Sequence, residues 1–144
     1  MARSQSLITD SLSQAHAALL DDLAKLEDAT RAIVGDGLGL VCTRLSATRA
    51  HVLEHFQFEE KDGYMDKVRK REPRFERTIQ ELYNEHGRLA QSIDALVEEA
   101  KAARELTDGF RQRIREWIEC VRKHEARESR LVLDAFNSEV GAED

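Results

Sequence analysis

Apolar residues recur every three or four positions along most of the chain, which is the spacing of helices with one buried face. A first segment of this kind spans roughly residues 4–34 and ends at Gly35-Asp36-Gly37, and a second weakens at Asp62-Gly63. Pro73 suits the first turn of a third helix, and Thr107-Asp108-Gly109 separates this helix from a fourth. The sequence therefore predicts four helices joined by three turns.

Short connections make consecutive helices antiparallel. The pattern thus predicts an all-α fold, an up-down-up-down antiparallel four-helix bundle, with residues 1–144 as a single domain. The basic run at residues 67–74 is predicted to be a solvated connection, and residues 137–144 a frayed end. The four apolar faces are expected to meet in one core, which contains Leu12, Leu19, Leu20, Leu23, Leu26, Val41, Leu45, Val52, Phe56, Phe75, Ile79, Leu82, Leu89, Ile93, Leu96, Ala100, Phe110, Ile114, Trp117, Val121, Leu131 and Ala135.

Polar residues interrupt each of these apolar stripes. Residues three or four apart share a helix face, so every helix points a histidine inward and two helices add a carboxylate one turn later. The interrupting residues are His16 in the first helix, His55 and Glu59 in the second, His86 in the third, and His124 and Glu128 in the fourth.

The six residues are also predicted to lie in one layer of the bundle. Two residues of an antiparallel hairpin are level when their midpoint falls at the turn. Three pairs meet this condition at the predicted turns: His16 with His55, Glu59 with His86, and His86 with Glu128. An unpaired buried carboxylate costs several kcal/mol or becomes neutral. Two divalent or trivalent cations would satisfy all six groups together.

Other residues near this layer have less definite roles. His51 lies one turn before His55, where it is either a fifth nitrogen ligand or a partly exposed outer residue. Tyr83 precedes His86 by three residues and either reaches the site or lies at the core edge. The polar residues predicted to form the solvated surface are Glu54, Glu60, Glu125 and Arg127.

Composition narrows the partners and the compartment. The net charge of −6 argues against nucleic acid or an anionic membrane as a partner. No stretch resembles a signal peptide or a membrane span, which favours a cytoplasmic location. Cys42 and Cys120 would differ by about 13 Å in height along the bundle, too far for a disulfide, so both are predicted to be free thiols.

The motifs around these histidines resemble those of the hemerythrin-like family, the HHE cation-binding domain, over almost the whole chain. The likeness rests on a lone His16, on HFQFEE at 55–60, on EHGRL at 85–89 and on HEARE at 124–128. It implies a non-haem pair of iron ions, joined by an oxo or hydroxo bridge. The four histidines of the layer would be nitrogen ligands, and the two carboxylates would bridge the irons. Zinc or manganese stays open, since ligand type alone does not settle the metal.

The chain departs from the oxygen-carrying hemerythrins at two points. Their third helix carries HxxxH, whereas the positions four before and four after His86 are Leu82 and Ala90. Their fourth helix carries HxxxxD, whereas this chain has HxxxE. One histidine is therefore missing unless His51 replaces it. About two coordination positions would stay open, which favours turnover of a small oxidant over simple gas binding.

Three functions are compatible with these motifs. The first is reaction with a small oxidant, either peroxide disproportionation of the catalase-like kind found in some members with this pattern or O2 or nitric oxide chemistry. The second is a binding or sensing module for O2, nitric oxide or iron, without turnover. The third is a helical bundle without metal. The redox partner and the oligomeric state do not follow from the sequence.

Overall fold

The structure, a computed structural model, describes residues 2–31, 37–61 and 64–143. The described residues form helices and connections and contain no strand, so the predicted all-α class is confirmed. The predicted turn residues Gly35, Asp36, Asp62 and Gly63, and the side chain of Leu12, lie outside the described part. The elements are α1 (Ala2–Thr30), α2 (Gly37–Lys61), α3 (Tyr64–Arg71), the single 3-10 turn η1 (Pro73–Phe75), α4 (Glu76–Ala102) and α5 (Asp108–Glu143).

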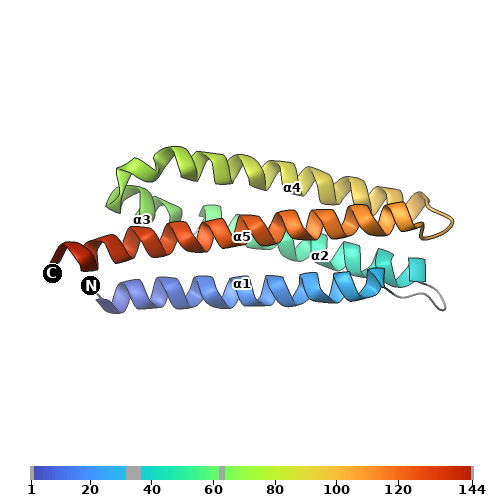
Figure 1. Cartoon of the computed structure of the whole chain (residues 1–144), viewed down its shortest axis with the longest axis horizontal. Helices are drawn as coiled ribbons and strands as arrows, with labels where there is room; N and C mark the ends of the chain where they lie inside the picture. Colours follow the sequence, from blue (N-terminus) through green and yellow to red (C-terminus); the bar gives the residue numbers. More distant parts are fainter. Residues whose placement is uncertain (1, 32–36, 62–63, 144) are drawn as a thin grey trace.

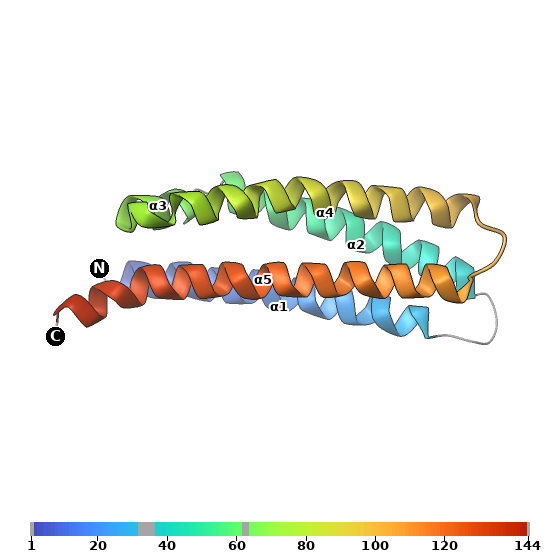
Figure 2. The same cartoon turned by 45° about the horizontal axis from the view of Figure 1, so that its top comes forward.

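The four long helices α1, α2, α4 and α5 lie side by side and alternate in direction (Figure 1). Figure 2 shows the same four helices from a second direction, with the last turn of α1, the first turn of α2 and the α4–α5 connection at one end. Both termini and the short α3 lie at the opposite end (Figure 1). The predicted antiparallel four-helix bundle is therefore confirmed.

The basic run at residues 67–74 is not the plain solvated connection that the sequence predicts. Tyr64–Arg71 form α3, and Glu72 closes it by donating its backbone N–H to the carbonyl of Val68 at 2.9 Å. Met65 and Val68 lie three residues apart and are both fully buried. The prediction failed because two apolar residues are too few to reveal a helical period among so many charges.

The ends of the last two helices are partly as predicted. Pro73 begins η1 rather than α4, so the third long helix starts three residues later than expected. Thr107 caps α5, because its hydroxyl oxygen accepts the backbone N–H of Phe110 at 3.1 Å. At the other end, α5 continues to Glu143, where the sequence predicts a frayed end.

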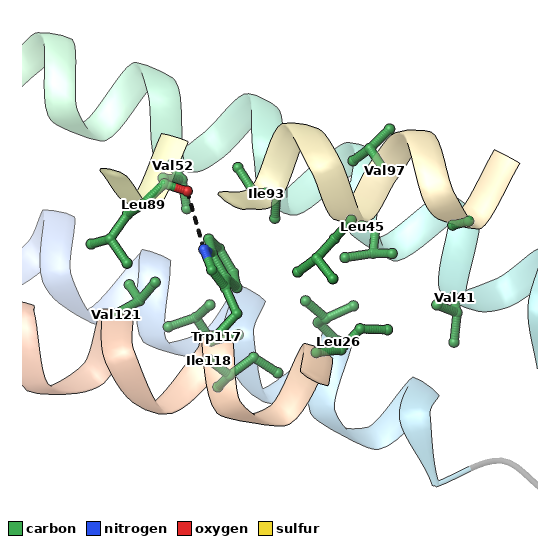
Figure 3. Packing of buried hydrophobic residues seen from close by; sticks show 14 of the residues in the cluster. Leu26, Val41, Leu45, Val52, Leu89, Ile93, Val97, Trp117, Ile118 and Val121 are labelled. Atoms are coloured by element: carbon green, nitrogen blue, oxygen red, sulfur yellow. Dashed lines mark hydrogen bonds between the residues drawn. The ribbon is translucent and has the colours of Figure 1, made fainter. Parts of the chain in front are cut away.

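The apolar core consists of two clusters rather than one. The larger cluster fills the half of the bundle near the α4–α5 connection, where Trp117 donates its indole N–H to the carbonyl of Leu89 at 3.1 Å (Figure 3). The smaller joins α3 to the adjoining ends of α4 and α5 and contains Met65, Val68, Ile79, Leu82, Leu131, Val132, Ala135 and Phe136. Each fully buried leucine or isoleucine contributes about 1.5–3 kcal/mol.

The polar layer lies between these two clusters. On α4, His86 follows Leu82 of the smaller cluster and precedes Leu89 of the larger one. On α5, His124 likewise lies between Val121 of the larger cluster and Leu131 of the smaller. On one side of the layer the larger cluster therefore holds all four long helices in register, and on the other side the smaller cluster holds α4 and α5.

Two further expectations concern the chain as a whole. Cys42 and Cys120 are free, as predicted, the first half-buried and the second exposed. Within the described ranges, no helix combines the length and the apolar character needed to cross a membrane.

Candidate metal centre

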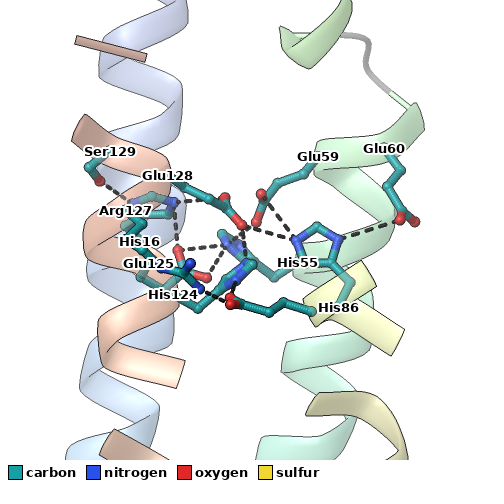
Figure 4. A network of polar contacts seen from close by, with 11 residues as sticks. His16, His55, Glu59, Glu60, His86, His124, Glu125, Arg127, Glu128 and Ser129 are labelled. Carbon is teal, nitrogen blue, oxygen red and sulfur yellow. Dashed lines mark hydrogen bonds and ion pairs between the residues drawn. The ribbon is translucent and has the colours of Figure 1, made fainter. Parts of the chain in front are cut away.

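The bundle brings the six predicted residues together in one layer, with contributions from α1, α2, α4 and α5 (Figure 4). A seventh residue, Glu125, joins them. All seven are less than a tenth exposed, and three of them, Glu59, His124 and Glu128, are 0% exposed. So many ionisable groups inside one core need each other or a cation for stability.

The side chains divide into two groups of possible metal ligands that share Glu128. The ligand atoms within each group all lie within 4.8 Å of one another. The first donor group consists of His16, His55, Glu59, Glu125 and Glu128, and the second donor group consists of His86, His124 and Glu128.

Two carboxylates reach from one group toward the other. Glu59 places Oε1 at 2.5 Å from Nε2 of His55 and Oε2 at 3.7 Å from Nε2 of His86. Glu128 places Oε2 at 3.8 Å from Nε2 of His16 and Oε1 at 3.0 Å from Nε2 of His86. Oε1 of Glu128 also contacts Nε2 of His124. Each carboxylate thus turns one oxygen to each side, which is the arrangement that a carboxylate bridge between two ions requires.

The outward nitrogens of three histidines have polar partners of their own. Nδ1 of His16 lies 2.8 Å from the hydroxyl oxygen of Ser129, and Nδ1 of His124 lies 2.6 Å from Oε1 of Glu85. Nδ1 of His86 lies 3.4 Å from Oε1 of Glu60. Such contacts fix the rotation of a metal-ligating imidazole. All three rings therefore present Nε2 to the centre of the layer.

The inward-facing atoms fit a metal pair. Nε2 of His16, Nε2 of His124 and Oε1 of Glu125 are fully buried and make no hydrogen bond of normal geometry. Nevertheless, Nε2 of His16 lies only 2.6 Å from Oε2 of Glu125. Once His16 loses its proton, the lone pairs of these atoms would converge on one point, as those of ligands around a cation do. Imidazole and carboxylate together suit iron, zinc or manganese.

Burial and mutual contact shift the pKa values in this layer strongly. Burial, followed by the neighbouring Glu128 and Glu125, raises the pKa of Glu59 to about 12. Burial opposes ionisation of Glu128 as well, but its contacts with Glu59, His124 and His16 outweigh it and hold its pKa well below the usual range. Burial lowers the pKa of His16, but Glu125 and Glu128 outweigh it and raise the value to about 9. In the metal-free protein, protons on Glu59 and His16 therefore offset part of the carboxylate charge.

The prediction that Glu125 lies on the solvated surface is wrong. It is 2% exposed and contacts both His16 and His55. A signal for its burial is present in the sequence, because Val121, Glu125, Glu128 and Val132 follow one another at helical spacings of four, three and four. The sequence prediction also overlooked Glu85, the partner of His124. The other predicted surface residues, Glu54, Glu60 and Arg127, are exposed.

His51 and Tyr83 lie beside the layer rather than in it. The side chain of His51 is 57% exposed, and its Nδ1 lies 2.8 Å from Oδ2 of Asp22, outside both donor groups. Tyr83 is half-buried against the smaller apolar cluster, and its ring centroid lies 5.8 Å from that of His86. Of the two alternatives for His51, the structure therefore supports the partly exposed outer residue. Tyr83 lies at the core edge.

Comparison with known proteins agrees with this geometry. The family model of the hemerythrin HHE cation binding domain matches residues 7–136, a range that contains both donor groups. No curated protein and no solved structure matches the chain significantly. The family match and the buried histidine–glutamate layer identify a metal-binding module. The chain belongs to the hemerythrin HHE cation-binding family.

Proposed function

We propose that this protein is a non-haem di-iron protein that reacts with a small oxidant, with hydrogen peroxide the first candidate and O2 or nitric oxide the next. One observation carries the proposal: Glu59 and Glu128 each turn one oxygen toward each side of the layer. A pair of iron ions held by these residues would supply two-electron redox chemistry to one small molecule. Disproportionation of peroxide, in which two H2O2 give two H2O and one O2, requires chemistry of this kind.

The side chains have distinct roles in this proposal. His16 and His55 would hold one ion and His86 and His124 the other. Glu59 and Glu128 would bridge the two ions and balance their charge. Bound iron would supply the redox chemistry, which zinc cannot supply. The ring of Phe56 stacks on His86 with 4.0 Å between centroids and meets the edge of His124 at 5.6 Å. This apolar wall excludes water from one side of the second donor group.

Oxygen evolution from peroxide tests the proposal directly. The protein is loaded with iron under anaerobic conditions, freed of excess metal and mixed with H2O2, and the oxygen released is compared with that from the same amount of free iron. We expect the iron-loaded protein to release oxygen faster than free iron does. In His124→Ala this difference from free iron should disappear. His51→Ala, which removes an exposed histidine outside the layer, serves as the matched control. Equal release from protein and free iron would refute the peroxide reaction.

The burial of the layer favours a second candidate, stoichiometric binding or sensing of O2, nitric oxide or iron. Glu59, His124 and Glu128 are 0% exposed, which restricts access to molecules of a few atoms and protects a bound gas from solvent. This candidate predicts a change in the visible spectrum that saturates at a fixed ratio of nitric oxide or O2 to iron, without oxygen release from peroxide.

A further inference from the structure

The third carboxylate of the layer, Glu125, faces only one side of it. Its Oε2 lies 2.6 Å from Nε2 of His16, and both of its carboxylate oxygens lie 3.1 Å from Nε2 of His55. Among the residues that the structure describes, it belongs to the first donor group and not to the second. Glu59 and Glu128 differ from it, because each reaches His86 as well.

Whether a carboxylate contacts the inward or the outward nitrogen of a histidine distinguishes possible metal ligands from residues that only orient the ring. Glu60 and Glu85 contact histidines at Nδ1, the outward nitrogen, and their side chains are 43% and 21% exposed. Glu125 contacts Nε2, the inward nitrogen that would bind the metal, and its side chain is 3% exposed. A carboxylate that only oriented an imidazole would contact the outward nitrogen. Glu125 therefore lies where a ligand lies.

We propose that Glu125 is a terminal ligand of the ion held by His16 and His55, so that the two ion positions are unequal. This inference rests on the metal centre proposed above. The first position has five protein ligands, namely the members of the first donor group. The second position has four, His86 and His124 with the bridging Glu59 and Glu128.

The inequality determines where a small oxidant binds. An ion at the first position would have almost all of its coordination sites filled by protein residues, whereas an ion at the second position would keep more of them open. The ring of Phe56 and the half-buried ring of Tyr83 pack against His86, on the side of this more open position. The oxidant would therefore bind at the position lined by His86 and His124. The first position, with more ligands and one more negative charge, fills first when metal is added.

Anaerobic titration with Fe2+ tests the order and the ligand. We expect the wild type to take up two ions in two steps of different affinity. Glu125→Gln should weaken the tighter step by more than about 100-fold, beyond the roughly 10- to 100-fold typical of losing an outer partner, and leave the weaker step unchanged. His86→Gln should do the opposite. Glu54→Gln, which removes an exposed carboxylate of α2, should alter neither step. Two steps in Glu125→Gln with wild-type affinities would overturn the role of Glu125.

The Mössbauer spectrum of the iron-loaded wild type gives a second readout, which decides the matter even if Glu125→Gln does not fold. Unequal positions give two quadrupole doublets of equal area, and equal positions give one, which would overturn the proposal. Azide, a small anionic probe, should change only one of the two doublets, and it should be the doublet that His86→Gln alters. A change in the other doublet would contradict oxidant binding at His86 and His124. If the wild type binds no iron at all, the proposed di-iron function itself is refuted. If it binds two ions with equal affinity and gives one doublet, the di-iron function stands and only the role of Glu125 is refuted.

Discussion

Nδ1 of His124 lies 2.6 Å from Oε1 of Glu85, so a carboxylate of α4 orients a histidine of α5. The second oxygen of Glu85 contacts the guanidinium of Arg127, one turn further along α5. His124 is fully buried, whereas the side chain of Glu85 is 21% exposed. The contact therefore connects the inner layer to the surface and fixes the direction in which Nε2 of His124 points.

Glu85→Gln is expected to lower metal affinity without removing a ligand. An amide cannot hold the imidazole as a carboxylate does, and loss of such a partner typically lowers metal affinity by about 10- to 100-fold. Competition between the protein and a coloured chelator for Fe2+ measures the change. Glu81→Gln, an exposed residue of the same helix, is the matched control. Affinities of the two variants within about twofold of each other would show that Glu85 has no such role.

The sequence predicts the bundle and the level of the layer because both follow from helical periodicity. A histidine at a position where leucine is expected marks the inner face of each helix, and the turn positions then fix its height. Glu125 escaped prediction because HEARE offers two carboxylates and only Glu128 continues the spacing of four from His124. Helix geometry places Glu125 beside Glu128, and the packing of α1 against α5 decides that it is buried.

The division of the core into two clusters could not be read from the sequence either. The stripes of α4 and α5 continue through His86 and His124, and nothing in their spacing separates Leu82 from Leu89. The polar layer separates the two clusters, and α3, whose Met65 and Val68 close one end of the bundle, completes the smaller one. This helix has eight residues and too short a stripe to show a period.

His51→Ala is expected to leave metal binding unchanged, in contrast to His55→Ala. The side chain of His51 is 57% exposed and pairs with Asp22, whereas that of His55 is 5% exposed and belongs to the first donor group. The two residues lie one turn apart on α2, so the pair is closely matched. Iron content of the purified variants after anaerobic loading checks this. A loss of iron in His51→Ala would instead show that His51 is a fifth histidine ligand.

Metal loading is expected to release protons. In the metal-free protein the pKa of Glu59 is about 12 and that of His16 about 9, so both carry protons at pH 7. Both must give up these protons to bind a metal, and about two should be released per centre. Metal affinity should therefore rise steeply with pH up to about 9, where His16 loses its proton without help. Above this pH the number of protons released should fall by one, and the affinity should rise less steeply. Calorimetric titrations with Fe2+ in buffers of different ionisation enthalpy measure the number. Release that stays at zero across this pH range would contradict the charge state inferred for the layer.

Metal binding is also expected to stabilise the fold, because the converging ligands exist only in the folded chain. At a free metal concentration of one hundred times Kd, the free energy of unfolding should rise by about 2.7 kcal/mol. His86→Ala should lose part or all of this increment, since it removes a ligand of the second donor group. Leu23→Ala, at a fully buried position of the larger cluster, should cost about 2–5 kcal/mol with or without metal and keep the increment. Thermal unfolding of the wild type, His86→Ala and Leu23→Ala, each with Fe2+ and with a chelator, distinguishes loss of metal binding from loss of core packing. An increment that survives in His86→Ala and vanishes in Leu23→Ala would mean that the metal acts through the packing of the bundle and not through this layer.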